Sequence, residues 1–177
     1  MPEIASLVCH PATPCRALAG IAVTIERLPT GGLRLAYRLA GSLARLRLPA
    51  PMTPGPADGL WQHTCCEAFI GLADGAYREF NFSPSGQWAL YDFSGYRQRS
   101  SGATPAGTPG IVATSRPDAL LVTVDLPPTL LPPGASALGL TVVVEEADGD
   151  RSYWALAHAA PQPDFHRRES FLAALPA

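Results

Sequence analysis

The sequence predicts an all-β protein of about ten strands with little helix. Nineteen prolines and sixteen glycines in 177 residues require many turns and short elements, which suits strands better than helices. No segment free of these two residues carries apolar side chains at the 3.6-residue period of a helix. Because 47% of the residues are hydrophobic, one sizeable core can form. We therefore expect a single domain over residues 1–177, with an irregular lead-in at 1–16.

The charge balance argues against a nucleic-acid partner. Thirteen basic and fifteen acidic residues give a net charge of -2, so no basic patch is expected to attract phosphates.

The chain opens with Met1, Pro2 and Glu3, without the basic and apolar segments of a secretory signal. Its apolar runs have the length of strands and not of a membrane span. We expect a cytoplasmic protein with no membrane partner, and four cysteines without a CxxC pair fit that compartment.

Three strands are expected in the first third of the chain. Apolar and polar side chains alternate over 21–28 and again over 33–40, and the Thr-Gly-Gly run at 30–32 signals a hairpin turn between them. A shorter alternating run follows at 43–48. Four prolines in 49–59 exclude regular structure there. We expect a long loop that leads the chain to the next strand.

Residues 60–97 hold the densest group of aromatic side chains and predict a three-stranded antiparallel meander. Turn signals at 73–75 and 83–86 separate three runs of alternating polarity. The proposed register pairs Glu67 with Asn81, Phe69 with Glu79, Phe80 with Leu90, Phe82 with Trp88 and Arg78 with Asp92. The last pair joins opposite charges, which favours this register over its one-residue slip.

This register gives the meander two different faces. The core face carries Cys66, Ala68, Ile70, Phe80 and Phe82. The other, which we call the mixed face, combines acids, an amide and rings: Glu67, Phe69, Tyr77, Glu79, Asn81, Ala89, Tyr91 and Phe93. Such residues can form an ordinary solvated surface or a site for a small polar ligand. Because four of the eight are aromatic, we expect a second layer or a ligand to cover this face.

Strands resume after a Ser-, Gly- and Pro-rich loop at 98–110. Apolar or alternating runs predict strands at 111–114, 120–126, 137–146, 152–157 and 170–175. The Asp-Gly-Asp run at 148–150 is a further hairpin turn.

Four segments together carry a family resemblance: LWQHTCCEAFIG (60–71), YREFNFSPSGQWALYDFSGYR (77–97), EEADGDRSYWALAH (145–158) and PDFHRRESF (163–171). They resemble the bacterial DOMON-like domain proteins, relatives of the family 9 carbohydrate-binding modules. The resemblance extends from about Ala17 to the end of the chain. It implies an antiparallel β-sandwich of immunoglobulin-like or jelly-roll type that binds sugars in some branches and haem in others. The chain departs from the family at Cys66, where Phe is usual, and at Arg99 and Ser100, which replace Gly-Met.

We expect a non-catalytic module that binds a small polar ligand on the mixed face, above all a carbohydrate. Rings stack on the C–H faces of pyranoses, and carboxylates and amides bind hydroxyls. The expected platforms are Trp61, Phe69 and Tyr91, the expected hydroxyl partners are Glu67, Glu79 and Asn81, and Arg97 is expected at the rim. A core position competes with the platform role for Trp61 and Trp88, and Trp88 points inward in the proposed register. We expect no cofactor and no metal.

Two other classes of function stay open. The resemblance allows a haem protein of the b-type cytochrome kind, with Met52 and His158, or His63 and His158, as axial ligands. Alternatively the aromatic rings of the mixed face contact another protein, or a second copy of the chain in a homodimer. Colour would identify the first, and a concentration-dependent mass the second.

No catalytic constellation stands out. Glu67 and Glu79 share one face, as the acid and base of glycoside cleavage do, but two acids on neighbouring strands are common without any chemistry. Near the end of the chain Asp164 could orient His166 through its carboxylate. The competing interpretation is a turn followed by a charged surface.

Overall fold

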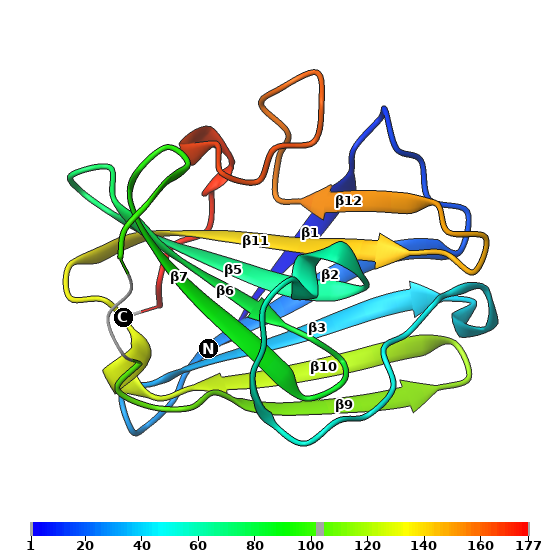
Figure 1. Cartoon of the computed structure of the whole chain (residues 1–177), viewed down its shortest axis with the longest axis horizontal. Coiled ribbons are helices and arrows are strands. Elements are labelled where there is room, and N and C mark those ends of the chain that lie inside the picture. Colours follow the sequence, from blue (N-terminus) through cyan, green and yellow to red (C-terminus); the bar gives the residue numbers. More distant parts are fainter. Residues whose placement is uncertain (1, 102–104, 177) are drawn as a thin grey trace.

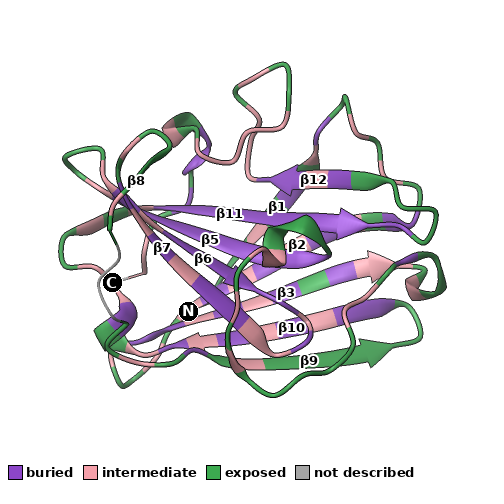
Figure 2. Cartoon of the chain, viewed as in Figure 1, coloured by how far each residue is buried: buried purple, intermediate pink, exposed green. Residues whose placement is uncertain are grey.

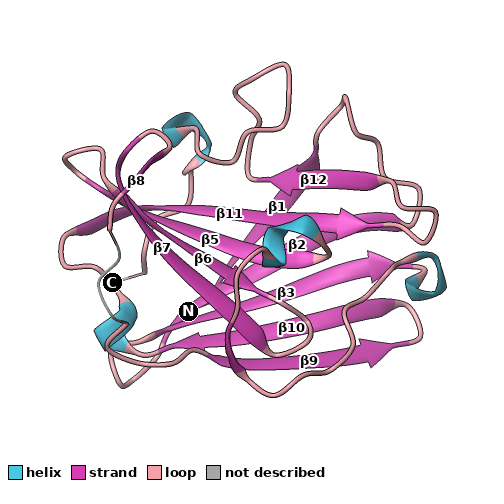
Figure 3. Cartoon of the chain, viewed as in Figure 1, coloured by secondary structure: helices cyan, strands magenta, loops and turns pink. Residues whose placement is uncertain are grey.

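The computed structural model describes residues 2–101 and 105–176, which fold into β-strands joined by turns and loops (Figure 3). These parts of the chain contain twelve strands and no α-helix. The strands are β1 (Glu3–Cys9), β2 (Leu18–Arg27), β3 (Leu33–Gly41), β4 (Gly55–Pro56), β5 (Cys65–Leu72), β6 (Tyr77–Phe82), β7 (Gln87–Gly95), β8 (Gln98–Arg99), β9 (Gly110–Arg116), β10 (Ala119–Leu126), β11 (Ala135–Glu145) and β12 (Arg151–Ala155). Four 3-10 turns complete the elements: η1 (Leu43–Arg45), η2 (Leu60–Gln62), η3 (Pro128–Leu130) and η4 (Arg168–Ser170). The all-β prediction is confirmed.

The strands follow one continuous path, in the order β4-β7-β6-β5-β11-β12-β1-β2-β3-β10-β9, with β8 paired to β7. β1 joins the two halves of this path because it pairs with β2 on one side and with β12 on the other. The sheet curls, so that the half containing β5, β6 and β7 faces the half containing β2, β3 and β10 (Figure 1). The hydroxyl of Tyr37 on β3 donates a hydrogen bond of 2.8 Å to the backbone oxygen of Glu67 on β5 across the core.

The main core lies between these two halves and buries the predicted core face of the meander. Cys66, Ala68, Ile70, Phe80 and Phe82 pack there against side chains of β2, β3 and β10. Figure 2 shows this burial along β5 and β11, whereas β9 is largely exposed. The burial of so many aliphatic and aromatic side chains supplies most of the stabilising free energy of the fold.

The predicted register of the meander is confirmed at every proposed pair. Arg78 and Asp92 lie opposite each other and form a bidentate ion pair, with Nε–Oδ1 at 2.7 Å and Nη2–Oδ2 at 2.9 Å. The register was predictable because the alternation of side chains and the charge pair depend on residues that lie only 6 to 14 positions apart. Trp88 is 5% exposed and lies in the main core, as the register predicts.

Five sequence predictions outside the meander need correction. The two regions expected to be loops, 49–59 and 98–110, contain the two-residue strands β4 and β8, which both pair with β7. The lead-in at 1–16 is irregular only from residue 10 onward, because Glu3–Cys9 forms β1. Most of its side chains are exposed, so it lacks the alternating signal of a half-buried strand. The expected strand at 43–48 is the turn η1 followed by a single bridge from Leu46 to Glu146. The expected strand at 170–175 pairs with β11 only at Ala173, since η4 occupies its start.

The last segment, residues 163–173, covers part of the mixed face. Phe171 packs on Phe69 and Tyr77, with ring centroids 5.6 and 5.9 Å apart, respectively. Gly139 on β11 makes room for it, because a Cβ atom there would lie 2.6 Å from the Phe171 ring. The rings of the mixed face thus form a second, smaller core, and the expectation of a covering layer is confirmed for this part.

No helix among the described residues is long and apolar enough to span a membrane.

Candidate functional site

A cavity of about 770 Å³ lies on the part of the mixed face that residues 163–173 leave open. The sheet strands β5, β6 and β7 form its floor, and η2 and the segment 163–166 contribute walls. Its lining groups the side chains by kind: the acids Asp58, Glu67 and Glu79, the bases Arg97, Arg99 and His166, and the rings of Trp61, Phe69, Tyr91, Phe93, Tyr153 and Phe165. A volume of this size is typical of sites that hold a small molecule.

Six of the seven predicted site residues line this cavity, and Asn81 does not. Asn81 is fully buried, and its amide Nδ2 donates a hydrogen bond of 2.8 Å to Oε1 of Glu79. Its Oδ1 atom has no hydrogen-bond partner within the described residues. The role expected for Asn81, direct contact with a ligand, is therefore wrong for this geometry. The amide instead holds the Glu79 carboxyl group from the adjacent position on the same face of β6.

Two carboxyl groups of unequal character form the polar floor. Glu67 is 2% exposed and accepts a hydrogen bond of 3.0 Å from the Thr141 hydroxyl. Burial first, and then the nearby charge of Glu79, raise the pKa of Glu67 well above its ordinary value. Burial also raises the pKa of Glu79, but the Asn81 hydrogen bond and the charges of Arg99 and Arg97 oppose that rise. Of the two carboxyl groups, Glu67 is therefore the one that binds a proton more readily, and Glu79 is the one that ionises more readily.

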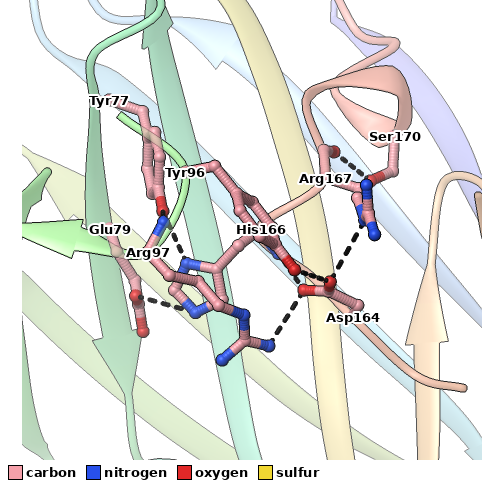
Figure 4. Close-up of polar contacts among 8 residues, drawn as sticks. All are labelled: Tyr77, Glu79, Tyr96, Arg97, Asp164, His166, Arg167 and Ser170. Carbon is pink, nitrogen blue, oxygen red and sulfur yellow. Dashed lines mark hydrogen bonds and ion pairs between the residues drawn. The ribbon is translucent and has the colours of Figure 1, made fainter. Parts of the chain in front are cut away.

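His166 faces Glu79 from the covering segment (Figure 4). Its Nδ1 atom is 2.7 Å from the Tyr77 hydroxyl oxygen, and its Nε2 atom is 3.9 Å from Oε2 of Glu79. Burial, followed by the positive charge of Arg97, lowers the pKa of His166 to about 4. The ring is thus neutral at physiological pH, with one nitrogen protonated and the other an acceptor.

Asp164 fixes the covering segment to the rim of the cavity. Its Oδ1 accepts from Nη2 of Arg97 at 2.9 Å and from the backbone N–H of His166 at 3.2 Å. Its Oδ2 accepts from the Tyr96 hydroxyl at 2.6 Å. Although burial alone would raise it, these hydrogen bonds from Tyr96 and Arg97 hold the pKa of Asp164 below its ordinary value. Asp164 does orient His166, but through the backbone N–H and not through the ring.

The expected platforms differ in how much ring they expose. Trp61 lies in η2 and is 52% exposed, since Gly59 at φ 73° turns the chain just before it. The Tyr91 ring is mostly buried, and the Arg99 guanidinium lies 4.1 Å from its centroid. Phe69 borders the cavity, but its side chain is completely buried beneath the neighbouring rings, so the expectation that it offers a stacking surface is wrong. Of the three, Trp61 presents an open face, and the core position considered for it is also wrong.

The sequence alone missed several cavity residues. Asp58 accepts a hydrogen bond of 2.8 Å from the Tyr91 hydroxyl, yet it lies in the proline-rich loop. Arg99, Tyr153 and Phe165 come from three separate segments. Local patterns give only weak signals for such residues, because folding of distant segments over the meander brings them to the cavity. The alternation of β12 and the short spacing from Arg97 to Arg99 were the only hints.

The residues considered as haem ligands lie elsewhere. Met52 is 57% exposed in a loop, and none of Met52, His63 and His158 lines the cavity. His63 bonds Oε2 of Glu145 through Nδ1 at 2.8 Å, and Nε2 of His158 lies 2.8 Å from the backbone oxygen of Val8. Within residues 2–101 and 105–176, no group of three His, Cys, Asp or Glu side chains is arranged to hold a metal ion.

Comparison with known proteins gives a likeness of fold. No protein-family model matches the chain, and no curated protein matches it significantly. The chain is similar to the crystal structure of a "putative carbohydrate-binding protein" from Bacteroides uniformis ATCC 8492, with a TM-score of 0.67. The match covers 96% of this chain and 84% of that one, at 15% sequence identity. At such identity the likeness establishes the shared all-β fold alone.

Proposed function

We propose that this chain is a non-catalytic binding module whose cavity takes a carbohydrate or a similar polyhydroxylated ligand. The lining of the cavity carries the proposal. It combines the exposed ring of Trp61 with the carboxyl group of Glu79, two guanidinium groups and the neutral imidazole of His166. A sugar needs both a flat apolar surface for its C–H face and fixed donors and acceptors for its hydroxyls. The carbohydrate-binding description of the structural neighbour supports the same class of ligand.

We further propose that the chain is a DOMON-like protein related to the family 9 carbohydrate-binding modules, with its curled sheet as the corresponding β-sandwich. The motifs in 60–97 and 145–171 support this relationship. So does the fold shared with the Bacteroides uniformis protein. A cytoplasmic location and a homodimer stay predictions from the sequence.

The state of the two carboxyl groups supports a binding role without catalysis. Glycoside cleavage needs one acid that reaches the leaving group and a second carboxylate that reaches the sugar or a water. Glu67 is almost completely buried, and its Oε2 atom accepts a hydrogen bond from the Thr141 hydroxyl, so it is poorly placed to reach a sugar. Of the two glutamates, Glu79 is the more exposed, at 6% against 2% for Glu67, and the third acid of the lining, Asp58, is held by the Tyr91 hydroxyl. This arrangement suits hydroxyl binding and not a two-acid mechanism.

Replacing Trp61 with alanine tests the proposal. Isothermal titration calorimetry with a panel of neutral mono- and disaccharides is expected to find at least one ligand for the natural protein. Loss of the stacking surface is then expected to weaken its binding by about tenfold to a hundredfold. Because Trp61 is 52% exposed, the melting temperature should change by no more than about 2 °C.

Met52→Ala is the matched control, since Met52 is a large apolar side chain of similar exposure outside the cavity. It should leave both affinity and melting temperature unchanged. The proposal is wrong if no saccharide in the panel binds, or if Trp61→Ala binds the ligand as tightly as the natural protein does.

A further inference from the structure

The hydrogen bonds around Tyr77 determine which nitrogen of His166 carries the proton. The backbone N–H of Arg97 donates to the Tyr77 hydroxyl oxygen at 3.2 Å. The hydroxyl proton is then free to point at Nδ1 of His166, 2.7 Å away. The opposite tautomer would leave a bare Nε2 lone pair facing the Glu79 carboxylate at 3.9 Å, which is repulsive. Nδ1 is therefore the acceptor, and Nε2–H points toward Glu79.

Arg97 donates to Tyr77 from a strained backbone conformation. Its φ of 55° makes it the one non-glycine residue of the described segments in the left-handed region. Such a conformation is uncommon for a side chain like that of arginine, and it persists where surrounding contacts hold it. Here the Tyr77 hydroxyl and the Asp164 carboxylate hold it, through the backbone N–H and the guanidinium.

The space between His166 and Glu79, where this series of hydrogen bonds ends, can hold one oxygen atom. At 3.9 Å, Nε2 of His166 and Oε2 of Glu79 are too far apart for a hydrogen bond to each other. If an oxygen lies about 2.8 Å from each of these two atoms, the angle Nε2–O–Oε2 at that oxygen is roughly 90°. Such an oxygen must accept a hydrogen bond from Nε2–H and donate a hydrogen bond to the carboxylate. An alcohol does both, whereas an ether or a methoxy oxygen can only accept.

We propose that His166 and Glu79 form a clamp for a single ligand hydroxyl, with Tyr77 as its positioning residue. This rests on the proposed function and narrows the ligand to alcohols with a free O–H at the clamped position. Both clamp residues line the cavity. Asn81 holds Glu79 through a hydrogen bond of 2.8 Å, and Tyr77 holds His166, so that neither group has to reorganise when the hydroxyl arrives.

The tautomer of His166 is the first test, and it needs no ligand. Nitrogen-15 spectra of histidine-labelled protein at neutral pH are expected to show a protonated Nε2 and a bare Nδ1 for His166. Tyr77→Phe keeps the ring that stacks on Phe93 at 4.7 Å but removes the hydroxyl, and should give a mixture of the two tautomers. Tyr96→Phe removes a neighbouring hydroxyl, the one that donates to Asp164, and should leave the tautomer unchanged. A protonated Nδ1 in the natural protein would overturn the clamp.

The second test uses glycerol as a minimal alcohol and 1,2-dimethoxyethane as a probe that cannot donate. Glycerol is expected to shift the His166 ring signals in a saturable manner, and dimethoxyethane is not. His158 is the internal reference, because its ring bonds the backbone oxygen of Val8 outside the cavity. Tyr77→Phe should weaken the response to glycerol by about three- to tenfold. Equal responses to both probes, or none to either, would overturn the clamp.

These outcomes separate the clamp from the proposed function. Suppose a saccharide of the panel binds and depends on Trp61, but leaves the His166 signals where they were. The function then stands and the clamp is wrong. If no saccharide binds, the proposed function fails, while glycerol still decides whether the clamp exists. For a saccharide that binds, replacing one particular hydroxyl by methoxy should cost tenfold or more in affinity.

Discussion

Phe171→Ala is expected to destabilise the protein by about 3 kcal/mol. Phe171 is 7% exposed and fills the space between Phe69, Tyr77 and the bare backbone of Gly139. Its removal leaves a cavity in the smaller core and loosens the segment that carries His166 to the ligand cavity. For a chain of 177 residues, the melting temperature should fall by roughly 10 °C. Denaturant-induced unfolding followed by circular dichroism measures the change.

Leu172→Ala is the control for this prediction, because Leu172 is the next residue and is 65% exposed. It should change the free energy of unfolding by less than about 0.5 kcal/mol. Gly139→Ala approaches the same contact from the other side, since the added methyl group would meet the Phe171 ring at 2.6 Å. If Phe171→Ala unfolds at the same denaturant concentration as Leu172→Ala, residues 163–173 do not pack on the mixed face.

Glu67→Gln is expected to stabilise the protein at neutral pH, by about 1 to 3 kcal/mol. Glutamine keeps the acceptor for the Thr141 hydroxyl, which now bonds Oε2 at 3.0 Å. Its amide also supplies a permanent donor opposite Asn81, whose Oδ1 has no partner in the described parts of the chain. At the same time the substitution removes a group that must keep its proton in order to stay buried.

The pH dependence gives the sign of this effect. The folded-state pKa of Glu67 is raised by burial and by Glu79 above the ordinary value of 4.5. Its contribution is therefore fully present below about pH 4.5 and is lost as the pH rises toward the folded-state pKa. The gain of Glu67→Gln over the natural protein should be small at pH 4 and should grow toward pH 8. Unfolding midpoints measured across this range test the trend.

The titration of His166 changes the stability with pH in the opposite direction, and this change is the same in the natural protein and in Glu67→Gln. Its pKa falls from 6.5 to about 4 on folding, so protonation costs stability as the pH drops from about 6.5 to 4. Both proteins contain His166, and the difference between them reports Glu67. Glu169→Gln is the control, because Glu169 is exposed and should show no such gain. A loss of stability in Glu67→Gln at every pH would mean that the buried carboxyl is ionised and held by partners.

Local sequence patterns determined the meander and its two faces. The pairs Glu67–Asn81, Phe82–Trp88 and Arg78–Asp92 are as predicted. They follow from alternation with period two and from one charge pair across a short turn, and such interactions are encoded within about twenty residues of chain. For the same reason the hairpins at 30–32 and 148–150 and most strands of the second half were predictable, as was the all-β class.

Only the tertiary structure decided what covers the mixed face and where it stays open. The segment 163–173 returns over β5 and β6 and buries Phe69, while it carries His166 to Glu79. The strand signal in its sequence, at 170–175, does not reveal this position, because the position depends on Gly139 and on contacts with Tyr77 about ninety residues away. Asn81 and Phe69 therefore had the expected positions on the strands but not the expected exposure. Side-chain alternation determines which face of the sheet a residue occupies, whereas its solvent exposure depends on segments that are distant in the sequence.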